Sequence, residues 1–428
     1  MSIRNRRGLA VAVAAALAAA GLTTLPISAA QAAPGDPVVF GDSRLQACAE
    51  LEVGLAPVTE GDAALVTSLS CDYLDINDLT GLEKFTGLEV LSLTGNQIGD
   101  LGPLSHLTSL EELSLALNQV SDISDLAGLH SLTALNLAFN QISDISPLAN
   151  LNSLTALSLD GNQVTDAGPL GTLTSLTYLV LTTNQITDVS PLGHLTSLTY
   201  LYLSQNQITD VSALAGLNSL TLLWLDQNQI TDISPLARLT DLTDLFLYKN
   251  LITDVSPLAG LNLLGVLSLD SNRIIDLSSL SGQAAAITTA HDQRPPDLSA
   301  SVGAPISLHT VTHTDGSVLT GTITPNTYTV NPNGTVTFNA PGSYTFTWNQ
   351  TVPGIATIFS GQFTIVVAAS SPPPPPGVGG GTSAATDTLP WTGKDPWPEA
   401  GLALILLATG VFMRFLGRQR YRAAHRAT

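Results

Sequence analysis

Basic side chains are scarce in this 428-residue chain, which has 15 Lys and Arg against 34 Asp and Glu and a formal net charge of −19 at pH 7. Most of the cations lie close to the two ends, so residues 33–392 hold six cations and 32 acids, a net charge of −26. Such a surface lacks the clustered cations that displace counterions from phosphates. The shortage therefore excludes nucleic acid and anionic membranes as partners.

Signatures of catalysis and metal binding are also missing. The chain has no nucleophile–base arrangement, no metal-ligand spacing and no glycine-rich phosphate loop. His309 and His313 could share a strand face, but two histidines alone are more simply read as surface residues. Acid pairs such as Asp226 and Asp244 could approach each other on neighbouring strands, but no deep cleft is expected there. We predict no enzyme, no catalytic residue, no metal and no cofactor.

The N-terminal segment, residues 1–32, has the pattern of a secretory signal peptide. Arg4, Arg6 and Arg7 precede an apolar Ala/Val/Leu run, and Ala30 and Ala32 are spaced as an A-x-A cleavage site. An amphipathic core helix is the alternative, but the run has no polar face. We therefore expect a secreted protein.

Cysteine is almost absent, with Cys48 and Cys71 the only two. Because a secreted protein meets an oxidising environment, we favour a single disulfide that closes the N-terminal region. The alternative is two separate buried thiols, since Cys71 stands where a core leucine would otherwise be.

An internal repeat is the strongest pattern in the chain. Asparagines recur at a constant interval without a slip, at positions 96, 118, 140, 162, 184, 206, 228, 250 and 272. Around each runs L-x-L-x-x-N-x-I/V-x-D, followed by further leucines. An earlier copy from Leu69 has Leu74 in place of the asparagine and reads as a degenerate first repeat. The pattern predicts a solenoid of repeats over residues 69–282.

The invariant positions of the repeat predict its secondary structure. Each L-x-L run alternates inward and outward as a short strand, and stacked copies form a parallel sheet about 5 Å from strand to strand. The asparagine turns the chain and satisfies buried backbone groups. An aspartate stands at the fourth position after each asparagine, from Asp100 to Asp276. A cation ladder is possible there, but we favour caps that accept backbone N–H bonds at the start of a helical turn.

The remaining segments have different compositions. Residues 36–68 precede the first repeat. Residues 283–369 contain short alternating runs such as "NGTVTFNA" and "GSYTFTWNQ", which predict an all-β sandwich that also caps the open sheet edge. Residues 370–388, "SSPPPPPGVGGGTSAATDT", are expected to form a Pro- and Gly-rich spacer.

The C-terminal segment, residues 389–428, begins with "LPWTG", and an apolar run from Ala400 to Met413 and a basic tail follow it. This order of features resembles the LPxTG cell-wall sorting signal of Gram-positive bacteria. The resemblance implies that a sortase cleaves after Thr392 and joins it to peptidoglycan, with the precursor transiently in the membrane. A retained transmembrane helix is the alternative, although the run is short against the ~20 apolar residues of a span. The motif residues are Leu389, Pro390, Trp391, Thr392 and Gly393.

Residues 36 to about 369 resemble the internalin family of Gram-positive surface proteins, whose leucine-rich repeats have the same 22-residue period. The resemblance implies an acidic helical cap over residues 36–68. It also implies a leucine-rich-repeat solenoid, with its parallel sheet on the concave face, followed by an immunoglobulin-like domain. It also implies adhesion as the function, with the ligand unknown.

The variable positions of the repeat lie two, four and six residues before each asparagine, and their side chains should face the concave side. They are small or polar in the early repeats, such as Ser92 and Ala134, and aromatic from the fifth regular copy onward. Only 5% of the chain is aromatic, so this cluster stands out. The predicted ligand-binding residues are Tyr178, Tyr200, Tyr202, Trp224, Phe246 and Tyr248, with the acids Asp160, Asp226, Asp244 and Asp270.

Two functions fit this cluster. Exposed aromatic rings beside carboxylates suit a protein or glycan ligand, which makes the chain a wall-anchored binding protein. Alternatively the rings stabilise the sheet by cross-strand packing, and the protein is a structural spacer of the envelope. We favour the first.

Overall fold

The computed structural model describes residues 35–312, 314–319, 321–351 and 358–369. The predicted signal peptide, His313, the spacer, the sorting motif from Leu389 to Gly393 and the apolar run behind it lie outside the described residues. Within the described residues no helix is long and apolar enough to cross a membrane.

Two short helices, α2 (Ser43–Val53) and α3 (Glu60–Ala63), precede the first strand. A disulfide joins Cys48 of α2 to Cys71, with 5.8 Å between their Cα atoms. Both cysteines are buried, so the bond ties the helices to the core of the first repeat.

Ten parallel strands of three residues each follow at the repeat spacing. Their middle leucines are buried and their flanking residues point outward, as the L-x-L pattern predicts. Paired residues occupy the same position in successive repeats, as in Tyr200↔Leu222. The strands are β1 (Ser68–Ser70), β2 (Val90–Ser92), β3 (Glu112–Ser114), β4 (Ala134–Asn136), β5 (Ala156–Ser158), β6 (Tyr178–Val180), β7 (Tyr200–Tyr202), β8 (Leu222–Trp224), β9 (Asp244–Phe246) and β10 (Val266–Ser268).

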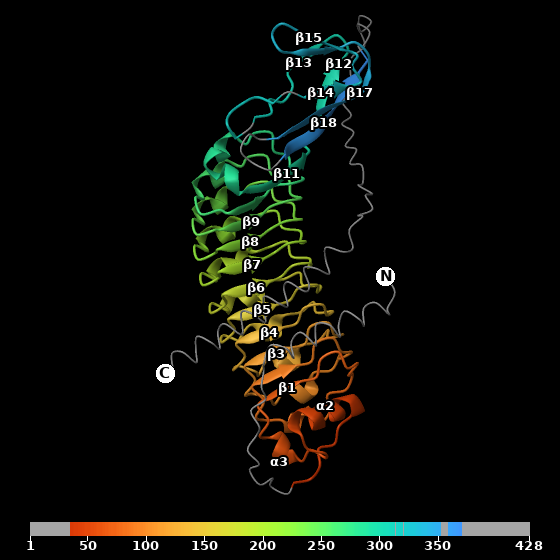
Figure 1. The fold of residues 1–428 in the computed structure, drawn as a ribbon, viewed down its shortest axis with the longest axis vertical. Coiled ribbons are helices and arrows are strands. Elements are labelled where there is room, and N and C mark those ends of the chain that lie inside the picture. The colour runs from red at the N-terminus through yellow and green to blue at the C-terminus, as the bar shows by residue number, and fades with distance from the viewer. Residues whose placement is uncertain (1–34, 313, 320, 352–357, 370–428) are drawn as a thin grey trace, which may run out of the picture.

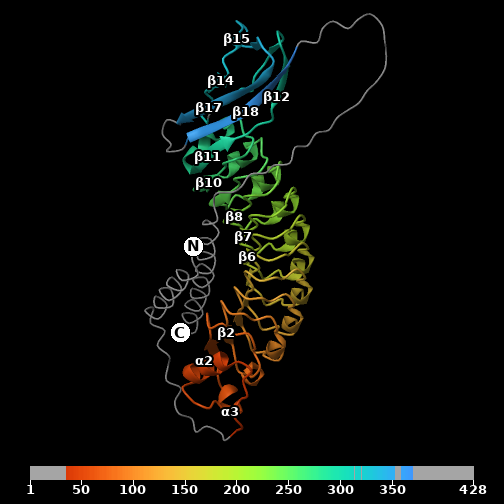
Figure 2. The ribbon, with the colours of Figure 1, turned by 90° about the vertical axis from the view of Figure 1, so that its right-hand side faces the viewer.

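Short 3₁₀ helices line the opposite side of the solenoid, which bulges outward in Figure 2. The sheet therefore forms the concave face. The helices are η1 (Leu82–Lys84), η2 (Gly102–Leu104), η3 (Ser124–Leu126), η4 (Ser146–Leu148), η5 (Gly168–Thr172), η6 (Ser190–His194), η7 (Ser212–Gly216), η8 (Ser234–Arg238), η9 (Ser256–Gly260) and η10 (Ser278–Ala286).

The repeated aspartates act as the predicted caps. Asp122 Oδ1, for example, accepts a hydrogen bond of 2.8 Å from the backbone N–H of Ser124, the first residue of η3. The carboxylates from Asp100 to Asp276 all make this bond. The bond lowers the pKa of Asp122 because it favours the charged form.

The asparagines form a buried ladder along the solenoid. Asn206 Oδ1 accepts the N–H of Ile186 at 3.0 Å, and its Nδ2 donates to the carbonyls of Leu181 at 2.9 Å and Leu203 at 3.1 Å. Each asparagine thereby joins its own repeat to the preceding one. These bonds satisfy backbone groups that water cannot reach, so they hold the spacing of the strands.

The parallel sheet continues beyond residue 282 into β11 (Ile287–Gln293). There Gln293, which is fully buried, takes the place of an asparagine: its Oε1 accepts the N–H of Ile274 and its Nε2 donates to Leu269. β11 also pairs with β18 (Ile358–Ala368), so the repeats and the C-terminal strands share one sheet (Figure 1).

The C-terminal strands are mostly antiparallel. β18 pairs with β17 (Gly342–Thr351), which pairs with β14 (Thr322–Thr324), while β12 (Leu298–Ser301) runs parallel to β18. A second sheet has the order β13 (Pro305–Ile306), β16 (Val336–Phe338) and β15 (Tyr328–Val330). Phe338 of one sheet and Tyr344 of the other lie 4.4 Å apart between ring centroids, so aromatic residues pack between the two sheets.

Candidate binding face

The aromatic residues predicted from the sequence come together on strands β6 to β9. We call Tyr178, Tyr200, Tyr202, Trp224, Phe246 and Tyr248 the aromatic stripe. The strand register pairs Tyr178 with Tyr200 and Tyr202 with Trp224, which is paired with Phe246 in turn. The parallel stacking of identical repeats is what places these side chains side by side.

The rings of the stripe touch across the strands. Centroids are 6.0 Å apart for Tyr178 and Tyr200, 5.6 Å for Tyr178 and Tyr202, 5.2 Å for Tyr202 and Trp224, and 4.7 Å for Trp224 and Phe246. Tilted and edge arrangements dominate, which are the favoured geometries of aromatic pairs. These rings therefore pack across neighbouring strands, and this packing stabilises the sheet.

Exposure divides the stripe. Tyr178 is buried, and it packs with Ala134, Ala156 and Val180. The other five rings, those of Tyr200, Tyr202, Trp224, Phe246 and Tyr248, are half-buried and keep part of their surface open. Burial raises the pKa of the Tyr202 phenol to about 12, so its hydroxyl stays protonated at neutral pH. Tyr202, Trp224 and Phe246 contact one another in a row, and all five rings keep an accessible apolar surface.

Asp226 is the most enclosed of the predicted acids and has several polar partners. The hydroxyl of Ser204 donates to its Oδ1, and the amide of Gln227 donates to its Oδ2 at 3.4 Å and contacts the hydroxyl of Tyr248 at 3.3 Å. Burial raises the pKa of the Asp226 carboxyl, while the hydrogen bonds from Ser204, Tyr248 and Gln227 lower it. The carboxylate is fixed beside Trp224, two residues earlier on the same strand face.

The other three acids differ in their surroundings. Asp160 is buried, which raises the pKa of its carboxyl to about 7. Asp244 and Asp270 are half-buried, and each has one oxygen engaged locally. Asp244 Oδ2 accepts the hydroxyl of Thr243 at 2.6 Å, and Asp270 Oδ1 accepts the backbone N–H of His291. Asp244 and Asp270 therefore flank the half-buried rings with partly open carboxylates.

The N-terminal half of the concave face is chemically different. Its outward residues include hydroxyls that bond to one another: Ser92 donates to Asp72 at 2.7 Å, and Thr94 and Ser114 are 2.8 Å apart. The backbone N–H of Thr94 also bonds to Asp72. Because these groups satisfy each other, they offer little to a ligand, and the open apolar surface belongs to β7–β9.

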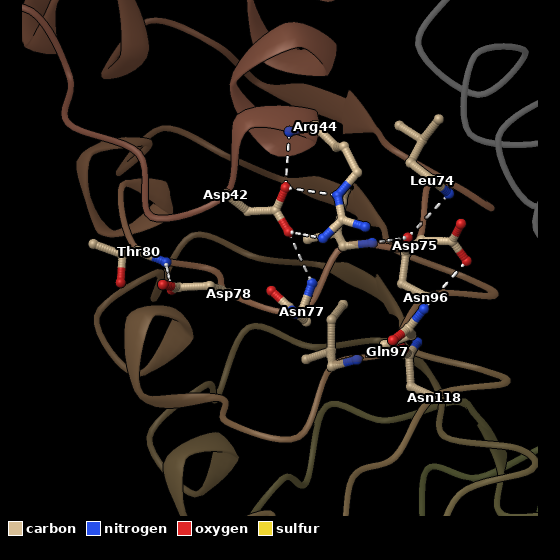
Figure 3. A network of polar contacts seen from close by, with 12 residues as sticks. Asp42, Arg44, Leu74, Asp75, Asn77, Asp78, Thr80, Asn96, Gln97 and Asn118 are labelled. Carbon is tan, nitrogen blue, oxygen red and sulfur yellow. Dashed lines mark hydrogen bonds and ion pairs between the residues drawn. The ribbon is translucent and has the colours of Figure 1, made fainter.

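A polar network closes the N-terminal end of the ladder, where Leu74 replaces asparagine (Figure 3). Asp42 forms an ion pair of 2.6 Å with Arg44 and accepts the backbone N–H of Asn77 at 3.1 Å. These bonds lower the pKa of the Asp42 carboxyl, the largest cause being the hydrogen bond from Arg44. Asp42 was not predicted as a cap, although an acid directly before a helix is a recognisable signal in the sequence.

The described residues hold no group of three or more His, Cys, Asp or Glu in a metal-binding arrangement. The acids of the concave face lie on separate strands, beside rings and hydroxyls. Their arrangement is suited to non-covalent contact.

Known sequences and structures place the repeats in a family. A family model of leucine-rich repeats in two copies matches residues 108–150, 152–194 and 196–238, and a model of a single leucine-rich repeat matches residues 87–102. An internalin of Listeria monocytogenes (inlF) is 36% identical, with a TM-score of 0.59 over 63% of this chain and 81% of that one. This chain belongs to the internalin family.

Two other solved structures are similar to parts of this internalin. Internalin C2 of Listeria monocytogenes is 37% identical over 52% of this chain and 100% of that chain, with a TM-score of 0.48. A leucine-rich-repeat protein of Leptospira interrogans is 26% identical over 54% and 64% of the two chains, with a TM-score of 0.49. No curated protein matches the chain.

The aromatic stripe was predicted from the sequence of this internalin, but two polar side chains were not. Ser204 of the preceding repeat donates a hydrogen bond to Asp226, and Gln293 extends the asparagine ladder. The repeat spacing contains a signal for both residues. Ser204 and Asp226 are one repeat apart at the same position, whereas Gln293 is an amide one position before the place where the period would put the next asparagine after Asn272.

Proposed function

We propose that this internalin is a surface binding protein that docks a protein or glycan ligand on the aromatic stripe. The observation that carries the proposal is the set of five half-buried rings on adjacent repeats, of which Tyr202, Trp224 and Phe246 form a continuous row of ring contacts. Clustered aromatic residues that keep open surface are typical of recognition sites. The remainder of the concave face is small or internally hydrogen-bonded, which supports a ligand position on the C-terminal half.

The competing function is that of an envelope spacer whose rings only pack. The ring contacts of 4.7–6.0 Å are compatible with it. The two functions differ in what removal of the open rings does, because a packing role affects stability alone.

The test compares three full-length proteins on a panel of glycans, extracellular matrix proteins and whole cells. They are the wild type, a triple variant (Tyr202→Ala, Trp224→Ala, Phe246→Ala) and the control Tyr73→Ala, which removes an exposed ring outside the stripe. Circular dichroism and thermal melting establish that each is folded. Binding by the wild type and the control that the folded triple variant lacks supports recognition by the stripe. No binding by any of them supports the spacer.

We also propose that the mature protein is covalently attached to the cell wall through Thr392. The support is the order of motif, apolar run and basic tail at the C-terminus. Thr392→Ala should move the protein from the wall fraction to the membrane or the medium, which fractionation and immunoblotting measure. Unchanged wall attachment would contradict the proposal.

For the C-terminal strands we propose an immunoglobulin-like sandwich. The two sheets pack aromatic residues between them, and the hydroxyl of Tyr344 donates to the carbonyl of Ala340, four residues upstream, at 2.9 Å. A tyrosine that bonds back to the preceding corner is a feature of such sandwiches. An experimental structure of this region tests the strand order directly.

A further inference from the structure

The outward positions of the concave strands are unbalanced in charge. Strands β1 to β10 each present three such positions, two on the strand itself and one two residues beyond it. Among these 30 positions there is no Lys, Arg or His. Six are acids: Asp72, Glu112, Asp160, Asp226, Asp244 and Asp270. The six cations of the described residues occupy other positions, such as Arg238 in η8.

The acids of the C-terminal half surround the half-buried rings. Asp244 precedes Phe246 by two residues on β9, and residues two apart in a strand point to the same face. Asp226 lies two residues beyond the end of β8 and is buried, whereas Asp270 lies two residues beyond the end of β10 and is half-buried. Asp244 and Asp270 are therefore the carboxylates that a ligand on the rings would contact.

Ligand docking would remove the half-buried carboxylates of Asp244 and Asp270 from water. A neutral sugar would leave the charges without a counterion, and desolvating an uncompensated charge costs several kcal/mol per ion. An acidic ligand adds repulsion. A cationic ligand compensates the charge through hydrogen bonds to the carboxylates and stacks over the faces of tryptophan, tyrosine and phenylalanine.

We infer that the ligand contacts the stripe through a segment rich in Lys or Arg, so that the partner is a protein with a basic patch. This inference rests on the proposed binding function of the stripe. The excess of acids over the mature chain attracts such a partner from a distance, which raises the rate of association.

The first experiment uses fluorescein-labelled peptides of repeating Lys-Gly-Ser, Arg-Gly-Ser and Glu-Gly-Ser, titrated into the full-length protein by fluorescence anisotropy. The Lys or Arg peptide should bind at least tenfold more tightly than the Glu peptide. Binding should weaken at least tenfold when the ionic strength rises from about 0.1 M to about 1 M, since the Debye length falls from about 10 Å to about 3 Å. Equal affinity for the Glu peptide, or no binding of either basic peptide, overturns the inference.

Substitutions separate this surface from the overall negative charge. Asp244→Asn and Asp270→Asn together should weaken binding of the basic peptide about five- to tenfold, and Trp224→Ala should do so by a similar factor. The matched control is Glu111→Gln with Asp241→Asn, which also removes two charges, from exposed positions before β3 and β9. If the control weakens binding as much as the double variant, attraction is non-specific and the inference is wrong.

Any ligand found in the panel of glycans, matrix proteins and cells can be used to test this inference separately from the proposed function. A panel ligand that requires Trp224 but is indifferent to salt and to Asp244 would leave the proposed function intact and overturn the inference. If no ligand and no peptide depends on Trp224, both are wrong.

Discussion

At the residue scale, the position before each asparagine adopts a left-handed conformation in every repeat. Its φ lies between 53° and 73° from Tyr73 to Ser271, yet only Gly95 and Gly161 are glycine there. A Cβ on Gly161 would lie 2.5 Å from Phe139 of the preceding repeat, and one on Gly95 would lie 2.3 Å from Tyr73. Glycine is therefore needed where an aromatic ring of the previous repeat covers the site.

This explanation predicts coupling between Gly161 and Phe139. Gly161→Ala should lower the free energy of unfolding by about 2–4 kcal/mol, from left-handed strain and from the clash with the ring. In a Phe139→Ala background the same change should cost only about 1 kcal/mol, the strain alone. Urea denaturation of the four proteins of this cycle measures the coupling, and equal costs in both backgrounds would contradict it.

Asp42 is the residue whose charge should matter most for stability at the N-terminal end. Because its pKa is lowered in the folded state, its contribution is complete above the ordinary value near 3.8 and declines as the pH falls below it. Asp42→Asn should lower the free energy of unfolding by about 1.5–3 kcal/mol at pH 7, through loss of charged hydrogen bonds.

The difference between Asp42→Asn and wild type should narrow below about pH 4, as chemical denaturation across pH 3–7 would show. Asp78→Asn is a suitable control, since Asp78 is a nearby acid that bonds to Thr80. A difference that does not change with pH would assign the effect to shape instead of charge.

At the element scale, the buried asparagines connect each turn to the one before. Asn206→Ala would leave the N–H of Ile186 without its partner, while the carbonyls of Leu181 and Leu203 would each lose one bond and keep another, from Asn184 and Asn228. The unsatisfied buried N–H costs about 1–3 kcal/mol and each lost hydrogen bond about 0.5–1.5 kcal/mol, so we expect a loss of about 2–6 kcal/mol. Gln207→Ala, at an exposed neighbouring position, should change stability by less than about 0.5 kcal/mol. Thermal and urea unfolding would measure both, and similar losses would refute a ladder role.

The repeated elements were predictable because each repeat is a local pattern copied at a fixed period. L-x-L located the strands, and the asparagine and aspartate located the ladder and the caps. The outward location of Tyr202 and Trp224 followed from the same alternation. The burial of Tyr178 was not predictable, because it depends on the small residues Ala134 and Ala156 in earlier repeats.

Contacts between distant segments also escaped prediction. β18 lies far along the chain from β11, and no local pattern indicates that they pair. The extension of the ladder to Gln293 was hidden because this amide lies one position short of the regular period. Where the repeat becomes irregular, the sequence period no longer indicates which side chains form hydrogen bonds with the backbone at the end of the sheet.

At the scale of the whole molecule, one continuous sheet should make the repeats and the C-terminal strands unfold together. β11 belongs to both parts, since it pairs with β10 and with β18, and Gln293 at its end bonds to Ile274 and Leu269. Calorimetry of the wild type should therefore show a single transition over both regions.

Gln293→Ala should weaken this junction, because it leaves the buried N–H of Ile274 without a partner and removes one of the two hydrogen bonds to the carbonyl of Leu269, which keeps the bond from Asn272. We expect a loss of about 2–5 kcal/mol and the separation of the single transition into two, the C-terminal strands melting first. Gln141→Ala, at an exposed position of the repeats, is the control that should keep one transition. Two transitions already in the wild type would mean that the shared sheet does not couple the two parts. A single transition in Gln293→Ala would mean that strand pairing alone is enough to couple the unfolding of the repeats to that of the C-terminal strands.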